Sequence, residues 1–548
     1  MGCGFISCRS WSARGACSAL PLLAAALLFG CSEDAPIRAE IEIVIDTDVP
    51  LLSQVDDPDA ALTTVRVDRL RIDVFDATGK RWLESREFAA GDFSNWPVTF
   101  GVHSAPDDEG RTFRLRVRAY PSGRVEALFV RDELGDIVFD ETGTPVPVLD
   151  LRGDPEQAPR RVFTVDRLVQ AKLEQGARRR LSVFLPGDCM GVEADVVTGF
   201  SCVQGGAQPA AVEISTAALE DVGELPASKV GSWSRAKGEP CLGAPRPPTP
   251  GLFDEDVCVQ GGVFHLGDDR VAHLPCDTGE PGICDAVPER VVAVSSFFMD
   301  RFHVTVGRMR AAMLRAEAPF APQVAQIATR TMNPTCVWTG PDGHLEPDYD
   351  PTEDGWPINC ISSLTAREFC QWAGGDLPTE VQWEYAATAA GRSFKTVNPW
   401  GDTVADCDGV VFERGQPGAP YTKCTDAGYP PGIAPVDSIL TAPVRDETPP
   451  PSVGATVGIV GMAGLMKQIQ RDGWQLYSEP CWQTAPFIDP ICSPEGASFV
   501  ASRGSMFNQN GVFLRSAYRS NFETSQPGNE FSASDTVGFR CVRLGAQP

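Results

Sequence analysis

Apolar and polar positions alternate along three stretches in the first third of the chain, Ile41–Ile45, Leu70–Val74 and Phe113–Ala119. In the third stretch, arginines fill every alternate position. A period of two puts one set of side chains on one face of a β-strand. The pattern predicts further strands near 125–130, 161–168 and 179–185. Short strands separated by turn residues predict an all-β, sandwich-like domain over residues 37–187. Its arginine-bearing face is either a binding surface or an ordinary solvated sheet face.

The pattern changes to a helical period further along the chain. Between Thr365 and Ala373 the apolar residues recur on one helical face, and Gly374-Gly375 follows as a stop signal. Pro378 then opens a second helix, in which Trp383, Ala386 and Ala387 have the same spacing. We expect the aromatic residues of both helices to lie in a hydrophobic core.

The chain begins with a segment typical of export. Two arginines precede the apolar run Ala19–Gly30, which is too short to span a bilayer and suits a secretory signal. The run ends in Leu28-Phe29-Gly30-Cys31, which resembles the lipobox of bacterial lipoproteins. This resemblance implies a signal peptide over residues 1–30, a lipid on Cys31 and a tether over 31–36. Ser32 favours the outer membrane as destination, and a plain signal peptide with a chance cysteine is the alternative.

Cysteine usage agrees with export. Of 18 cysteines, three lie in the predicted signal and one is Cys31, which leaves an even number. An even set in an exported chain is typical of disulfide bonds, whereas a zinc site would need CxxC-type clusters that are absent. Several cysteines are close in sequence: Cys189 and Cys202, Cys241 and Cys258, Cys276 and Cys284, Cys407 and Cys424, and Cys481 and Cys492. The Pro-rich stretch Pro245–Pro250 indicates a linker over residues 188–257.

Charge narrows the possible partners. The net charge is −26, from 47 Lys and Arg against 73 Asp and Glu. Nucleic acid is therefore excluded as a partner, because phosphate binding draws on an excess of basic residues.

Five blocks in the second half of the chain resemble the formylglycine-generating enzyme (sulfatase-modifying factor) family. The third block reads FCQWAGGDLPTEVQWEYAA from Phe369 and is similar to the family's FCxWAGxRLPTExEWEYAA. The blocks are Gly261–Gly267, Phe298–Gly307, Pro357–Ala387, Gly458–Ile469, and Leu514–Arg519 followed by Val537–Cys541.

The resemblance implies a domain over residues 258–548 with an irregular, C-type-lectin-like α+β fold. It implies a disulfide between Cys370 and Cys541, and by position a second one between Cys336 and Cys360. The final block also places Arg515 and Arg519 as candidates for a cleft, and Met506, in the interval before it, is a third candidate. For the two arginines, a structural role in ion pairs is the alternative.

The resemblance also implies which chemistry this chain lacks. The family's oxidase converts a substrate cysteine to formylglycine with copper(I) held by two thiolates, which are soft ligands suited to that ion. In the family this pair lies before the final GFRC. Here the interval from Ser502 to Arg540 contains no cysteine. We therefore expect no catalytic residue and no copper.

Two further metals are expected to be absent. The family's calcium motif, GNVWEW, supplies an Asn side chain, a Glu carboxylate and carbonyls, the oxygen donors that calcium requires. Here Leu465 replaces the Asn, Gln468 replaces the Glu, and Gly461 stands where the family has an Asp. Relatives that use iron bind it through clustered histidines. This domain has no such cluster, and His303 stands where the family has a structural Glu.

The sequence thus predicts a lipid-anchored protein of the bacterial cell envelope whose C-terminal domain binds a peptide or glycan without catalysis. One alternative is an active oxidoreductase acting on exported sulfatases. Another is a purely structural surface lipoprotein.

The lipid anchor gives the first testable prediction. Cys31→Ala should abolish incorporation of a radioactive fatty acid, because the thiol is the expected attachment site. Labelling of the expressed chain in bacteria measures this, with Cys17→Ala as the control. Labelling that survives in Cys31→Ala would contradict the anchor.

Overall fold

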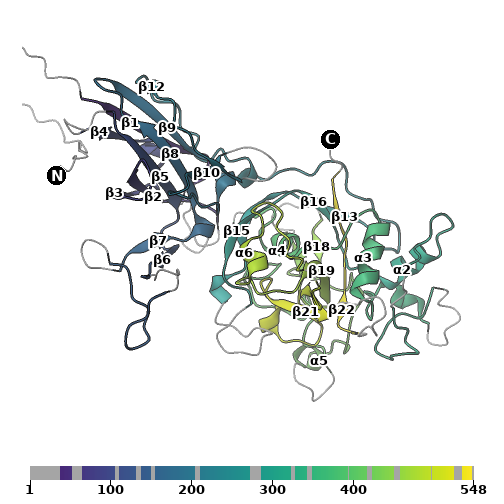
Figure 1. Ribbon diagram of the computed structural model, residues 1–548. Coiled ribbons are helices and arrows are strands. Elements are labelled where there is room, and N and C mark those ends of the chain that lie inside the picture. The colour runs from purple at the N-terminus through teal and green to yellow at the C-terminus, as the bar shows by residue number, and fades with distance from the viewer. Residues whose placement is uncertain are drawn as a thin grey trace, which may run out of the picture. The chain divides into compact units, whose positions relative to one another are not determined.

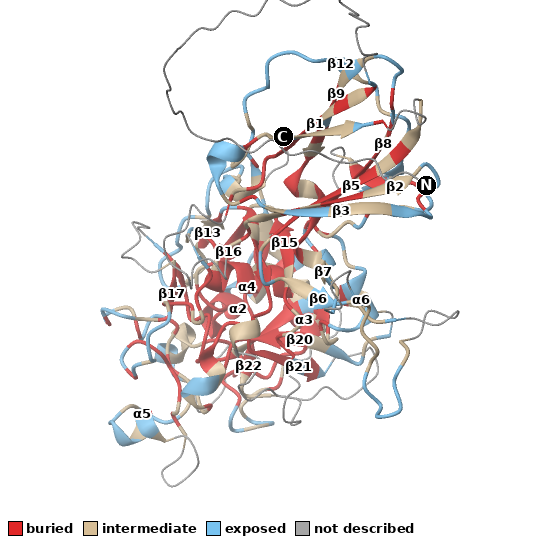
Figure 2. Ribbon diagram, turned by 90° about the vertical axis from the view of Figure 1, so that its left-hand side faces the viewer, coloured by how far each residue is buried: buried red, intermediate tan, exposed pale blue. Residues whose placement is uncertain are grey.

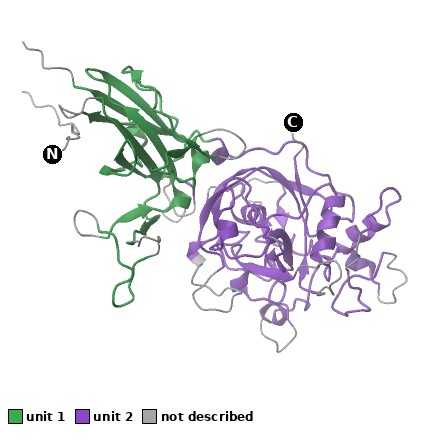
Figure 3. Ribbon diagram, viewed as in Figure 1, with its two compact units in different colours: residues 1–54, 66–233 green, residues 55–65, 234–548 purple. Residues whose placement is uncertain are grey.

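The structure is a computed structural model that describes residues 38–51, 64–104, 110–130, 137–149, 155–203, 210–271, 285–322, 327–341, 349–392, 394–415, 422–449, 457–494, 496–523 and 534–545. The predicted signal peptide, the tether, Cys31, Cys276 and Cys284 lie outside these residues. The chain forms two compact units, one of residues 1–54 and 66–233 and one of 55–65 and 234–548 (Figures 1 and 3).

The N-terminal unit consists of strands. Its described strands are β1 (Glu40–Thr47), β2 (Arg69–Asp76), β3 (Trp82–Ala89), β4 (Val98–His103), β5 (Thr112–Tyr120), β6 (Val125–Ala127), β7 (Gln157–Pro159), β8 (Val165–Lys172), β9 (Arg178–Leu185), β10 (Phe200–Val203), β11 (Ala210–Glu213) and β12 (Glu220–Asp221). They form two four-stranded sheets, β3-β2-β5-β8 and β12-β9-β1-β4, and two two-stranded sheets, β6-β7 and β10-β11. Ile41, Ile43, Leu115 and Val117 are fully buried, as their alternation predicts.

The arginine-bearing face of β5 is neither a free binding surface nor a solvated one. Arg118 donates to Asp73 at 2.6 Å, and Arg71 donates to the other oxygen of the same carboxylate at 3.1 Å. Arg116 pairs with Asp166 on β8 at 2.5 Å. Burial acts to raise the pKa of Asp73, but Arg118 and Arg71 hold it below its usual value. The face is therefore an internally neutralised ladder of charges.

Along the chain, the division between the two units falls after residue 233, within the segment 188–257 that the sequence indicates as a linker. Residues 188–233 belong to the first unit, where a disulfide joins Cys189 to Cys202 and β10 pairs with β11. Residues 234–257 belong to the second unit. There Arg246, in the Pro-rich stretch, donates its backbone N–H to Asp256 at 2.6 Å. Turn residues and prolines predict a spacer here. In the structure, residues 188–233 and residues 234–257 each make ordered contacts within their own unit.

The C-terminal unit mixes short strands with a few helices. The strands are β13 (Asp256–Val259), β14 (Gly262–Leu266), β15 (Arg290–Val294), β16 (Phe297–Asp300), β17 (Glu447–Thr448), β18 (Ile459–Val460), β19 (Lys467–Gly473), β20 (Phe499–Arg503), β21 (Arg519–Glu523), β22 (Val537–Gly538) and β23 (Val542–Leu544). The helices are α2 (Val306–Met313), α3 (Ser363–Trp372), α4 (Glu380–Thr388), α5 (Lys423–Asp426) and α6 (Pro480–Gln483). The largest sheet has the order β21-β20-β19-β22, and β13-β16-β23 form another.

Local sequence explains α3 and α4. Ser362 caps α3 by accepting the N–H of Thr365, and Gly374 takes a φ of 84° just after the helix, a conformation that glycine adopts without strain. Thr379 and Gln382 form a reciprocal capping box at the start of α4. Trp383 is fully buried in a core that contains Phe264, Phe297 and Tyr385. Figure 2 shows this burial along α4 and the strands around it.

Within the described part of the chain, no helix is long and apolar enough to span a membrane. In the same residues, strands outnumber helices, so the chain is a mixed α and β protein.

The charge ladder gives a prediction for the first unit. Asp73→Asn should destabilise the β2–β5 region by roughly 3 kcal/mol or more, because Arg71 and Arg118 lose a buried counter-charge. Hydrogen exchange of the peptides covering residues 69–120 measures this. Glu84→Gln breaks the ion pair with Arg86, whose side chain is 52% exposed, so this control should cost less than about 1 kcal/mol. Equal effects of the two substitutions would contradict the ladder.

Candidate functional site

A buried ionic cluster underlies the segment in which the family resemblance places copper and cleft. We call Glu380, Glu384, Lys395, Arg503 and Arg519 the ionic core. Arg503 on β20 lies directly opposite Arg519 on β21, an arrangement in which two like charges would repel each other. Glu380 and Glu384, one turn apart on α4, compensate both. All four side chains are completely buried.

The geometry of the ionic core is close to ideal. The Glu380 carboxylate accepts two hydrogen bonds from Arg519, each 2.7 Å long, and lies 3.1 Å from Nε of Arg503. Glu384 pairs with Arg503 and, at 2.7 Å, with Nζ of Lys395. Burial acts to raise the pKa of Glu384, but Lys395 and Arg503 hold it below its usual value. The Glu384 carboxylate is therefore charged, as its two basic partners require.

The ionic core anchors the intervening segment at both ends, because residues 504–518 connect Arg503 to Arg519. Within it, Ser505 donates to Gln509 at 2.9 Å, and Gln509 donates to the Tyr518 hydroxyl at 3.3 Å. The Arg515 guanidinium lies 5.6 Å from the centre of the Tyr518 ring.

The three cleft candidates differ in how far they are buried. Arg519 is completely buried and Arg515 is 2% exposed, whereas Met506 is half-buried. For Arg519, the structure shows the ion-paired role that the sequence left open as the alternative. The described cavity lies elsewhere, beside the Cys370–Cys541 disulfide, and Arg246, Asp256 and Phe298 are among its lining residues.

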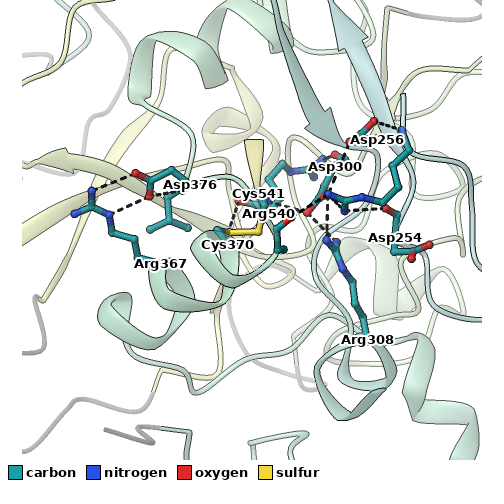
Figure 4. The surroundings of a disulfide bond; sticks show 12 residues. Asp254, Asp256, Asp300, Arg308, Arg367, Cys370, Asp376, Arg540 and Cys541 are labelled. Atoms are coloured by element: carbon teal, nitrogen blue, oxygen red, sulfur yellow. Dashed lines mark hydrogen bonds and ion pairs between the residues drawn. A yellow bond between two sulfur atoms is a disulfide. The ribbon is translucent and has the colours of Figure 1, made fainter. Parts of the chain in front are cut away.

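Disulfide bonds, which cysteine usage predicted, are present. Each of the twelve described cysteines is paired: Cys189–Cys202, Cys241–Cys258, Cys336–Cys360, Cys370–Cys541, Cys407–Cys424 and Cys481–Cys492. Figure 4 shows the Cys370–Cys541 bond between two ion pairs, Asp300–Arg308 at 2.8 Å and Arg367–Asp376 at 2.9 Å. No described cysteine is thus a thiolate able to bind a metal.

A tight turn over residues 461–468, which we call the Gly461 turn, packs against the ionic core. Gln468 accepts from the Trp383 indole at 2.8 Å and from Arg540 at 2.6 Å. Its amide donates to the carbonyls of Gly461 and Met462 at 3.0 and 3.2 Å. Arg540 also donates to the Gly461 carbonyl, at 2.9 Å. The oxygens of the turn therefore already face N–H donors.

His303 lies against the same turn. Its Nε2 donates to the Met466 carbonyl at 3.4 Å, and the side chain is 1% exposed. Burial, with Arg540 nearby, lowers the pKa of His303 well below its usual value. The imidazole is therefore neutral at physiological pH.

Residues 244–544 match the family model described as sulfatase-modifying factor enzyme 1-like domain, which covers more than half of the chain. The chain belongs to this family. The formylglycine-generating enzyme of Bos taurus is 26% identical over 56% of this chain and 78% of its own. That of Streptomyces coelicolor is 27% identical over 52% of this chain and 88% of its own.

Two other relatives differ in name. Hercynine oxygenase of Mycolicibacterium thermoresistibile is 33% identical over 30% of this chain and 38% of its own. A Bos taurus relative named inactive C-alpha-formylglycine-generating enzyme 2 is 23% identical over 53% of this chain and 89% of its own. Among solved structures, PvdO from Pseudomonas aeruginosa has a TM-score of 0.37 at 21% identity, covering 55% of this chain and 98% of its own.

The residues present do not fit the metals that the sulfatase-modifying factor family implies. Among the described residues, no group of three or more His, Cys, Asp or Glu side chains could hold a metal ion. Among these residues copper(I) has no thiolate ligand, because each described cysteine is in a disulfide. At the Gly461 turn the Asp446 carboxylate already accepts two backbone N–H groups, and the Arg540 guanidinium adds a positive charge.

Sequence reasoning missed Glu380 and Glu384 as the centre of the site. Both lie on α4 within one turn of the buried Trp383, where a solvated charge has no place. A pair of carboxylates on the apolar side of a helix is the signal that indicates buried basic partners.

Asp446, whose carboxylate accepts the N–H groups of Met462 and Ala463 in the Gly461 turn, gives a pH prediction. Burial raises its pKa to about 7. Between about pH 4 and 7 the folded state therefore holds a proton that the unfolded state has released, so this group lowers stability as pH rises through that window. Asp446→Asn should remove this effect, and its stability relative to wild type should increase from pH 5 to pH 8.

Thermal unfolding midpoints of both chains at several pH values measure the difference. Asp437→Asn is the control, because Asp437 is exposed. A difference between Asp446→Asn and wild type that is constant from pH 5 to 8 would contradict a raised pKa.

Proposed function

We propose that the C-terminal domain is a non-catalytic binding module of an exported, lipid-anchored envelope protein. One observation carries the proposal. The interval Ser502–Arg540 has no cysteine, and every described cysteine elsewhere is in a disulfide. The copper(I) chemistry of the family depends on two thiolates, so the scaffold remains without its reactive centre.

The relatives support the idea that this fold can be retained in a protein without the family's catalytic activity. One relative over half of the chain is named as inactive, so loss of activity has a parallel among similar proteins. The likeness to hercynine oxygenase supports no iron site here. His265 and His303 are the described histidines of this domain, and neither belongs to a cluster able to hold a metal.

The segment 504–518 is the surface that we propose for a ligand. The Ser505–Gln509–Tyr518 hydrogen bonds link the start of this segment to its end. Its edge offers apolar contacts, since Met506 and Phe513 are half-buried and Val512 is 40% exposed. Apolar contact beside hydrogen-bonding groups suits recognition of a peptide or a glycan. Anchoring through Cys31 would present this surface outside the membrane.

Two alternatives remain as outcomes of experiment. An active oxidoreductase would need a thiolate pair, for which only Cys276 and Cys284 are outside the described residues in the C-terminal unit. A purely structural lipoprotein would bind no peptide or glycan. A saturable ligand from an envelope extract, lost in Val512→Asp but kept in Val404→Asp, would support the module. Val404 serves as the control because its side chain is exposed and lies outside the segment 504–518.

The copper assay tests the proposal directly. The detergent-solubilised full chain, incubated with copper(I) and a CxPxR peptide, should form no formylglycine and retain no stoichiometric copper. Mass spectrometry and metal analysis measure both, with the Streptomyces coelicolor formylglycine-generating enzyme as the positive control. Turnover by this chain would overturn the proposal, and its loss in a Cys276→Ser, Cys284→Ser variant would identify the ligands.

A further inference from the structure

One buried arginine of the C-terminal unit has no guanidinium hydrogen bond or ion pair among the described residues. Arg414 is 5% exposed, and its Nε is buried without a hydrogen-bond partner. Its guanidinium lies 5.0 Å from the centre of the Tyr429 ring, whose hydroxyl donates to Asp408. Burial lowers the pKa of Arg414, and no neighbouring carboxylate raises it again. A buried cation thus lacks the counter-charge that burial normally requires.

Arg414 differs in this respect from the other buried arginines of the same unit. In the part of the chain that the structure describes, each of them donates at least one guanidinium hydrogen bond: Arg308, Arg310, Arg503, Arg515, Arg519 and Arg540. Acidic residues are abundant, since the chain has a net charge of −26. The Arg414 guanidinium is therefore available to an anion from outside the chain.

Arg414 lies against the segment 504–518, which we propose as the ligand surface. Its backbone N–H donates to the Phe507 carbonyl at 2.8 Å. The preceding Glu413 directs its carboxylate to the same segment, where it accepts the N–H of Gly511 at 3.3 Å. The acid next to Arg414 in the sequence is thus engaged by the backbone of the segment.

A second cation and apolar surface lie beside the same segment. Lys423 is exposed, and its Nζ lies 5.5 Å from the centre of the Phe412 ring. Gly511 approaches the same ring, because a Cβ on this glycine would lie 3.6 Å from Cε2. The next residue, Val512, is 40% exposed. Positive charge and apolar side chains therefore occur together along this part of the segment.

We propose that Arg414 binds a carboxylate of a peptide ligand, while the apolar edge of the segment 504–518 contacts the neighbouring side chains of that peptide. A guanidinium presents paired N–H donors that match the two oxygens of a carboxylate. The bound carboxylate would supply the counter-charge that the chain does not. Val512 and Phe513 favour a peptide with apolar residues over a glycan. The inference rests on the proposed binding function and specifies its ligand as an acidic peptide.

The first arm of the test measures stability. Arg414→Met keeps the aliphatic stem and should leave the thermal unfolding midpoint of the full chain unchanged or raise it, because it removes a buried charge without a partner. Arg308→Met is the matched control and should lower the midpoint, because Asp300 loses its buried partner. A midpoint lowered equally by both substitutions would overturn the proposal, since Arg414 would then be paired within the fold.

The second arm measures binding. Random heptapeptides displayed on phage and selected on the detergent-solubilised full chain should be enriched in Asp or Glu beside apolar residues. Synthetic copies should bind Arg414→Met about tenfold more weakly or less, because charge-assisted hydrogen bonds are lost. Arg414→Lys keeps the charge without the planar fork and should bind with intermediate affinity. Arg471→Met, which alters a partly exposed arginine paired with Asp376, should bind like wild type.

The outcomes separate this inference from the binding function on which it rests. Selected peptides that Val512→Asp no longer binds, but that show no preference for Asp or Glu, would overturn the role of Arg414 and keep the binding module. Selection of no peptide would overturn the peptide ligand. Binding of oligogalacturonate to wild type but not to Arg414→Met would then assign the carboxylate to a glycan, and failure of both probes would overturn the binding module as well.

Discussion

The C-terminal unit depends on the compensation of two adjacent buried arginines by two carboxylates on one helix. Arg503 and Arg519 would repel each other across β20 and β21, and Glu380 and Glu384 would each be a buried anion without them. Removing any one leaves an uncompensated buried charge, which costs several kcal/mol. Because residues 504–518 run from one arginine to the other, the same interaction sets where this segment starts and ends. The capping box of Thr379 and Gln382 fixes the helix that supplies both carboxylates.

The family scaffold is retained where residues hold the fold and altered where they would hold metals. The α3 cysteine and the last cysteine still form a disulfide, and the α4 motif still supplies the ionic core. The positions that match metal ligands carry Gly461, Leu465 and Gln468 in one place and lack cysteine in another. This difference supports the proposal that the domain binds a ligand without catalysis.

Sequence patterns predicted the elements whose own residues carry the signal. Alternation located β1, β2, β5, β8 and β9, and helical spacing with the Gly374-Gly375 stop and Pro378 located α3 and α4. The strand β3 was missed because its sequence, WLESREFA, has no buried alternate face. The division at residue 233 falls inside the predicted linker, but proline-rich sequence does not reveal the ordered contacts on either side of it. The Glu380–Arg519 pair was out of reach for another reason: its partners are 139 residues apart, and no local pattern encodes such a pairing.

The metal sites show how a contact can be read from two substitutions taken together. Histidine at 303 alone would be a buried polar group of uncertain purpose, and glycine at 461 alone would be an ordinary turn residue. In space a Cβ on the second would lie in van der Waals contact with the ring of the first. A smaller residue at 303 would leave a cavity beside the turn, and any side chain at 461 would be strained by the positive φ of that residue. The two positions are therefore neighbours in the folded core, which neither residue reveals by itself.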